Sequence, residues 1–167
     1  MSLKKLESEQ MSIAALRARL PSNCKAVLYD TLRADKRHRS KIFADTEALV
    51  VLYEGVIDGI KQGHFVVMIP RKTHIEYFSS LGHSPNHETT IIGLKNDVLK
   101  RILGSNFKYS RAKLQRNKYT VNTCARWVLA RCYLRSWNLQ HFQSFFHKRQ
   151  PITSPDDKVT LMTMILQ

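Results

Sequence analysis

The sequence predicts a mainly α-helical protein with one or two short strands. Apolar residues recur at helical spacing over most of the 167 positions, which favours helices. One run, residues 64–69, is rich in β-branched and aromatic residues, which is typical of a strand. Glycine and proline are few, six and five residues, so long disordered segments are not expected. At this length we expect one compact unit with three regions, 1–63, 64–104 and 105–167.

The first region, residues 1–63, is expected to be helical. An amphipathic helix is predicted over residues 2–20, and a shorter one over residues 24–32. Asp45 is a suitable N-cap for a third helix, with Gly63 just beyond its end. This third helix is apolar on most sides, so we expect it to be buried.

The second region contains the predicted strand. Residues 64–69 form this strand, which Pro70 closes. The apolar spacing then predicts a short helix over residues 71–81, a turn over 82–86 and a longer helix over 87–103.

The third region is predicted to hold a basic connector and a long C-terminal helix. Residues 107–118 have weak periodicity and form either a connector or an exposed helix. Asn122 or Thr123 caps the long helix, which extends to about residue 148. Residues 159–166 are compatible with a short strand or a short helix.

Basic residues are concentrated in the second half of the chain. The protein carries 27 Lys or Arg against 13 Asp or Glu, a net charge of +14. Residues 98–155 hold twelve of these basic residues and no acidic residue. Because such one-sided charge repels itself, we expect it to serve a polyanion. Aromatic residues such as Trp127 and Tyr133 lie among these charges, which favours nucleic acid over a membrane surface.

The order strand, short helix, turn and longer helix over residues 64–103 resembles a ribbon-helix-helix DNA-binding unit. The resemblance implies an obligate homodimer, in which the ribbons of two subunits pair antiparallel and enter the major groove of double-stranded DNA. It also implies that the start of the second helix contacts a phosphate.

Two sets of candidate DNA contacts follow. The ribbon and its ends would read bases, through Gln62, His64, Val66, Met68 and Arg71. The turn, the second helix and the basic connector would contact phosphates, through Lys72, Ser84, Asn86, His87, Arg101, Lys108, Arg111, Lys113, Arg116 and Lys118. Phosphate contacts set affinity and salt dependence and carry little sequence information.

One feature departs from the family pattern. The predicted ribbon is apolar on both faces, whereas family ribbons alternate buried apolar residues with polar residues that read bases. The alternative is a mixed, mainly helical fold in which residues 64–69 pair with residues 89–94 or 159–165.

The expected function is a dimeric, sequence-specific transcriptional regulator that binds a roughly two-fold operator. Its size and charge are similar to those of regulators encoded by plasmids and other mobile elements, and contact with RNA polymerase would fit the additional helices. The alternatives are an accessory protein of DNA processing or replication, and an RNA-binding protein that stacks bases on aromatic residues.

Other classes are not expected. The acidic residues are few and scattered and no Gly-rich phosphate loop follows a strand, so we expect neither an enzyme nor a cofactor. The cysteines lack metal-ligand spacing, and Cys124 and Cys132 are interpreted as core thiols, so no metal is predicted. The absence of a long apolar stretch and of a signal-like N-terminus favours a cytoplasmic protein with reduced thiols.

Overall fold

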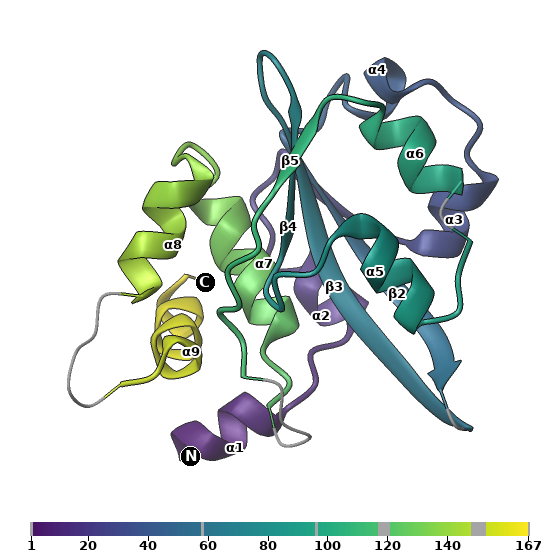
Figure 1. Cartoon of the computed structure of the whole chain (residues 1–167). Helices are drawn as coiled ribbons and strands as arrows, with labels where there is room; N and C mark the ends of the chain where they lie inside the picture. Colours follow the sequence, from purple (N-terminus) through teal and green to yellow (C-terminus); the bar gives the residue numbers. More distant parts are fainter. Residues whose placement is uncertain (1, 58, 96, 117–120, 148–152, 167) are drawn as a thin grey trace.

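The protein is an α/β fold in which a five-stranded mixed sheet lies between two layers of helices (Figure 1). The computed structural model describes residues 2–57, 59–95, 97–116, 121–147 and 153–166. The predicted mainly α-helical class is therefore wrong. No helix in the described part of the chain is long and apolar enough to cross a membrane.

The sheet has the strand order β1-β2-β3-β4-β5. Its strands are β1 (Cys24–Leu28), β2 (Ala48–Ile57), β3 (Ile60–Pro70), β4 (Ile75–Ser79) and β5 (Phe107–Tyr109). The three central strands are antiparallel, and the edge strands β1 and β5 run parallel to their neighbours β2 and β4.

Helices cover both faces of the sheet. One layer holds α3 (Tyr29–Ala34), α4 (Arg39–Ile42), α5 (Pro85–Ile91) and α6 (Asp97–Leu103). The other holds α2 (Ile13–Arg17), α7 (Cys124–Tyr133), α8 (Leu139–His147) and α9 (Pro155–Ile165), with α1 (Leu3–Ser8) against α9. Two hydrophobic cores result, because β2 and β3 bury side chains on both faces: Val50 and Phe65 lie in one core, and Val51 and Val66 in the other.

The largest correction concerns residues 45–63, which were expected to form a buried helix. They contain the whole of β2 and the start of β3. The run around Val50 is apolar at every position because both faces of the strand are buried. A continuous apolar run of this kind is equally typical of a buried helix and of a central strand.

The ribbon-helix-helix arrangement is also wrong. The strand predicted at residues 64–69 is confirmed within β3, but this strand pairs with β2 on one side and β4 on the other. Residues 71–81, expected to be a helix, contain β4. The backbone of β3 is therefore satisfied inside one chain, which removes the structural reason for a paired ribbon between subunits. Pairing with residues 89–94 or 159–165 is likewise wrong, since those segments are largely helical.

The remaining helix predictions hold in part. Residues 2–20 contain the two short helices α1 and α2, and residues 24–32 contain β1 followed by most of α3. The longer helix over 87–103 is divided into α5 and α6 around Gly93, whose φ is 71°. The long final helix is divided into α7 and α8, with Thr123 at the N-cap of α7 as predicted. Residues 159–165 lie in α9.

Candidate active site

A thiol, an imidazole and a carboxylate meet beyond the end of β4. Cys124 is the first residue of α7, and this helix packs against β3, which carries His64. The β3–β4 pairing ends at Val66 and Ser79, so His64 extends past the last residue of β4. Glu88 comes from α5, the helix that follows β4. The elements β3, α5 and α7 thus bring these three polar groups together beyond the end of β4.

Cys124 and His64 interact directly. Cys124 is partly buried against the core, and its thiol lies near enough to His64 for the imidazole to lower the pKa of the thiol. Burial raises the pKa of Cys124, but the hydrogen bond and charge of His64 outweigh it and leave that pKa below its ordinary value. Burial lowers the pKa of His64, whereas Cys124 and Glu88 raise it, and the net direction is upward. Both shifts favour a thiolate–imidazolium pair.

Glu88 and Ser79 both lie beside the Nε2 of the imidazole. The Nε2 of His64 lies 3.2 Å from the Oγ of Ser79 and 3.3 Å from the Oε1 of Glu88. The hydroxyl of Ser79 donates a hydrogen bond of 2.5 Å to the same carboxylate. Glu88 is only 2% exposed, and the Nδ1 of His83 approaches it to 3.4 Å. A buried carboxylate so placed orients the ring and stabilises its charged form.

Backbone N–H groups near the sulfur also lower the pKa of Cys124. The N–H groups of Phe65 and Ala125 hydrogen-bond to the thiol of Cys124 and lower its pKa further. Ala125 belongs to the first turn of α7, where N–H groups have no partner within the helix. The start of a helix also carries a partial positive charge, which favours an anion there.

The loop before α7 is fixed to the end of β4. The N–H groups of Leu114 and Gln115 both donate to the carbonyl of Ser80 at 2.9 Å. The side chain of Gln115 accepts from the hydroxyl of Ser80 and donates to the carbonyl of Val121. The chain can pass this closely because residue 82 is glycine: a Cβ at Gly82 would lie 2.6 Å from a carbonyl oxygen, and its φ is 71°.

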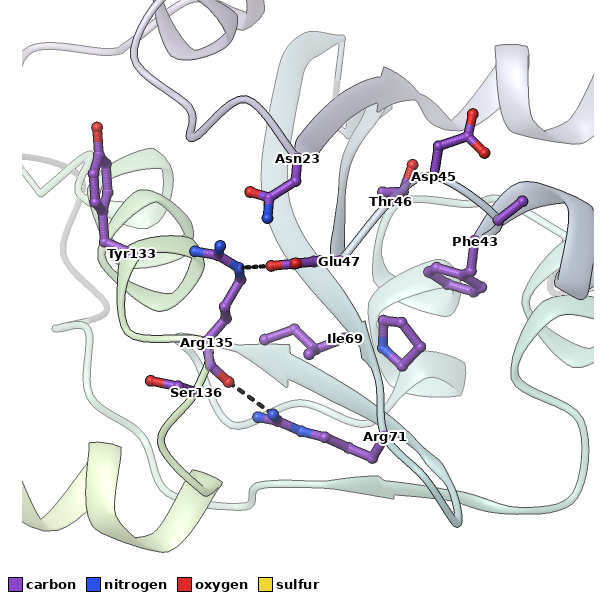
Figure 2. A pocket seen from close by; sticks show the side chains of 12 residues that line it. Asn23, Phe43, Asp45, Thr46, Glu47, Ile69, Arg71, Tyr133, Arg135 and Ser136 are labelled. Carbon is purple, nitrogen blue, oxygen red and sulfur yellow. Dashed lines mark hydrogen bonds and ion pairs between the residues drawn. The ribbon is translucent and has the colours of Figure 1, made fainter.

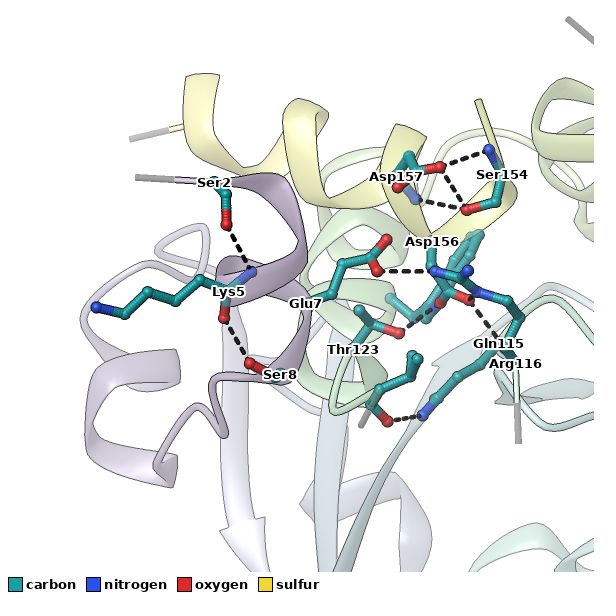
Figure 3. A network of polar contacts seen from close by, with 12 residues as sticks. Ser2, Lys5, Glu7, Ser8, Gln115, Arg116, Thr123, Ser154, Asp156 and Asp157 are labelled. Atoms are coloured by element: carbon teal, nitrogen blue, oxygen red, sulfur yellow. Dashed lines mark hydrogen bonds and ion pairs between the residues drawn. The ribbon is translucent and has the colours of Figure 1, made fainter. Parts of the chain in front are cut away.

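A buried polar network supports the start of α7 (Figure 3). Asp156 is fully buried and accepts hydrogen bonds from Thr123 at 2.5 Å, from the indole of Trp127 at 3.0 Å and from Arg116 at 2.9 and 3.1 Å. Arg116 also pairs with Glu7 at 2.7 Å. Burial outweighs this guanidinium and raises the pKa of Glu7 to about 7. The network links α1, α7 and α9 directly behind the residue that carries the thiol.

A cavity of about 600 Å³ lies between residues 10–13 and the strands β1, β2 and β3. Gln62, Gly63 and Phe65 contribute to its wall, together with the apolar side chains of Met11, Ile13, Leu28 and Leu52. Glu54 and Lys61, which pair at 3.3 Å, also line it. Neither His64 nor Cys124 lines this cavity.

A second cavity, of about 760 Å³, lies between the start of β2 and the loop after α7 (Figure 2). Its charged groups are engaged with one another: Arg135 hydrogen-bonds to Glu47, and Arg71 donates to the carbonyl of Arg135 at 2.7 Å. The residues that line it include no thiol. We therefore place the candidate active site at Cys124.

Most residues predicted to read bases are not on the surface. Val66 and Met68 are fully buried in the core beneath α5 and α6, and His64 is 8% exposed. Arg71 pairs with Glu76 at 2.8 Å and donates to two carbonyls of the loop after α7. Gln62 is exposed near the hairpin end of β3. These five residues do not form one surface that reads bases.

The predicted phosphate contacts are dispersed. Ser84 caps α5, where Asn86 and His87 are exposed, and the ring of His87 packs on His83. Arg101 donates to carbonyls of the segment 32–37, and Arg116 lies in the buried network. Lys118 lies outside the described residues. The structure does bring three of the predicted residues together at one cavity, Lys72, Lys108 and Arg111, while Lys113 is exposed.

Several basic residues of the second half of the chain serve the fold. Arg131 is fully buried and pairs with Glu76 at 2.7 Å. Arg126, 6% exposed, donates to Thr163, and Arg135 hydrogen-bonds to Glu47. Part of the positive charge of residues 98–155 is thus neutralised by acidic residues from other segments of the chain.

Comparisons with known proteins add no family assignment. Neither protein-family models nor curated proteins match this chain.

The sequence interpretation missed Cys124, Ser79 and Glu88 as site residues, and named His64 for a different role. One signal was present: Cys124 follows a predicted N-cap, and the start of a helix lowers the pKa of a thiol. Among the residues that the structure describes, no group of three His, Cys, Asp or Glu could hold a metal ion. The site is better suited to nucleophilic chemistry.

Proposed function

We propose that the protein is a cysteine-dependent acyl-transfer enzyme that hydrolyses an amide or ester bond. The observation that carries this proposal is the proximity of Cys124, at the start of α7, to His64, whose Nε2 lies 3.3 Å from the Oε1 of Glu88. A nucleophile beside a base, with the base oriented by a third group, is the arrangement that nucleophilic catalysis requires.

In the first step the thiolate of Cys124 attacks the carbonyl carbon of the substrate. The imidazolium of His64 gives its proton to the leaving amine or alcohol, and a thioester forms as the carbon–nitrogen or carbon–oxygen bond breaks. In the second step a water molecule gives a proton to His64 and attacks the thioester. The free acid leaves and the pair is restored, with no change in oxidation state.

Other residues of the site position these two groups. Glu88 and Ser79 fix the ring and stabilise its charged form, while the N–H groups at the start of α7 favour the thiolate.

An acyl probe tests this proposal without knowledge of the natural substrate. We expect p-nitrophenyl acetate to give a burst of one equivalent of nitrophenol, followed by slow turnover. Peptide mapping by mass spectrometry should place one acetyl group on Cys124. A Cys124→Ala variant should lack the burst, whereas the matched variant Cys24→Ala should retain it, because Cys24 lies in β1 and contacts Cys132 instead. Equal acetylation of both thiols in the wild type would refute the proposal.

This proposal departs from the expectation that the protein is no enzyme, which no comparison tests. The transcriptional regulator also stays a prediction, as do its alternatives in DNA processing and RNA binding. Base readout assumed a ribbon formed by strands of two subunits. In the structure this strand is β3, which pairs with β2 and β4 of the same chain. What supports nucleic-acid binding now is the basic cavity that Lys72, Lys108 and Arg111 line.

A further inference from the structure

A basic cavity of about 740 Å³ opens at the β5 edge of the sheet. The turn between β3 and β4 contributes Lys72 and His74 to its wall, and the chain from β5 onward contributes Lys108, Tyr109 and Arg111. The opposite wall comes from the loop after α7 and from α8, with the amide side chains of Asn138, Gln140 and Gln143. Cys124, His64 and Glu88 do not line this cavity.

The charge of the cavity wall is almost wholly positive. Lys72, Lys108 and Arg111 are exposed, and none of them makes an ion pair among the described residues. The one carboxylate among the lining residues is that of Glu76, which is 2% exposed and already accepts hydrogen bonds from Arg71 and Arg131. No acidic group of the wall therefore neutralises the three exposed cations.

A neutral donor of the wall also lacks an acceptor. The Nε2 of Gln143 is buried and has no hydrogen-bond partner in the described part of the chain. A buried donor without a partner is unfavourable, so a ligand oxygen at this place is favoured. The guanidinium of Arg111 lies 6.0 Å from the centre of the Tyr109 ring, and Phe107 stacks on the same ring at 6.3 Å. The cavity thus combines cations, an amide donor and an aromatic surface.

We propose that this cavity binds the phosphate backbone of a nucleic acid. Phosphate oxygens accept several charge-assisted hydrogen bonds at once, which suits a wall of donors with no free acceptor charge. The aromatic pair beside the cations favours a nucleic acid over an acidic peptide, because bases stack on such rings. The proposal is independent of the acyl-transfer chemistry, since the two sites share no residue.

Binding of a short fluorescent single-stranded DNA, whose bases are free to stack, is measured by anisotropy across salt concentrations and tests the proposal. The double variant Lys108→Ala/Arg111→Ala is compared with Lys4→Ala/Lys5→Ala, which removes two exposed lysines of α1 and the same net charge. We expect the cavity variant to weaken binding at least tenfold at low salt. The slope of log affinity against log salt should become shallower by about 1.4, because each lost phosphate contact on a single strand contributes about 0.7. The α1 variant should keep the wild-type slope.

One further variant and one further probe distinguish binding of a nucleic acid from binding of any polyanion. A Gln143→Leu variant should weaken binding several-fold without changing the salt slope, since it removes a neutral donor. Labelled polyglutamate should bind at least tenfold more weakly than DNA. Equal losses in the cavity and α1 variants would mean that net charge alone drives binding, and equal affinity for polyglutamate would remove the nucleic-acid assignment. Either result overturns the proposal. Cys124→Ala should bind DNA like the wild type, so a failure of the enzyme proposal remains distinguishable.

Discussion

The imidazole of His64 contacts the thiol of Cys124, although β4, β5 and two helices separate the two residues along the chain. The contact exists because α7 packs across β3 and begins where β4 has already ended. His64 belongs to a central strand, and Cys124 follows Thr123, whose hydroxyl donates to the buried Asp156. The sheet thus provides a rigid support for a reactive pair.

Replacement of Glu88 by Gln should narrow the pH range of activity. Burial lowers the pKa of His64, whereas Cys124 and the charge of Glu88 raise it. Loss of that charge lowers the pKa, so the imidazolium is lost at a lower pH and the alkaline limb of the rate profile moves to lower pH. The rate of Cys124 acetylation by p-nitrophenyl acetate against pH measures this shift. Glu9→Gln, at an exposed position, should leave the profile in place.

Replacement of Asp156 by Ala should destabilise the protein strongly. The change leaves Thr123, the indole of Trp127 and Arg116 without their shared acceptor. We expect a loss on the order of 3 kcal/mol in the free energy of unfolding, measured by urea denaturation. The matched variant Asp30→Ala removes an exposed partner of Arg33 and should change stability by less than about 1 kcal/mol. Equal small losses would contradict a structural role for the network.

The pKa of Glu7 makes a pH-dependent contribution to stability. Burial raises this pKa from 4.5 to about 7, so between these values the folded state binds a proton that the unfolded state releases. The contribution is therefore fully present at low pH and is lost as pH rises from about 4.5 to 7. In urea unfolding, the difference in stability between wild type and Glu7→Gln should change over this range. A difference that is constant with pH would show that Glu7 is ionised throughout.

Replacement of Arg131 by Met should affect folding and not nucleic-acid binding. Arg131 is fully buried, and its loss leaves the carboxylate of Glu76 with Arg71 alone. We expect a loss of about 3–5 kcal/mol in unfolding free energy, because one partner of a buried pair remains. Below its melting temperature the variant should bind DNA with the wild-type salt slope. The control Lys113→Met removes the same charge at an exposed position and should leave stability nearly unchanged.

The sequence predicts one strand correctly and misassigns its neighbours for a physical reason. Residues 64–69 are dominated by residues that favour strands, so local preference and tertiary structure agree there. Around Val50 and Phe78, both faces of the strand are buried, which removes the alternation that distinguishes a strand from a helix. The predicted fold class was wrong because both of these segments were interpreted as helices.

The candidate site could not be found from spacing along the chain. Cys124 was interpreted as a core thiol because its partners lie in β3 and α5, far away in the sequence. Similarly, Arg116 was predicted to contact a phosphate because its acidic partner Glu7 lies in a distant segment. Lys108 and Arg111 are exposed, as expected, and no acid of the described chain pairs with them, while their contact with phosphate stays a prediction.

The reactivity of Cys124 toward iodoacetamide, measured against pH, tests whether Cys124 and His64 form a catalytic pair. Peptide mapping gives the alkylation rate of each cysteine in the wild type and in a His64→Ala variant. We expect that Cys124 of the wild type reacts rapidly well below the pKa of an ordinary thiol, and that His64→Ala loses this reactivity at acidic pH. A wild-type Cys124 that reacts only at alkaline pH, with no change on loss of His64, would contradict a catalytic pair.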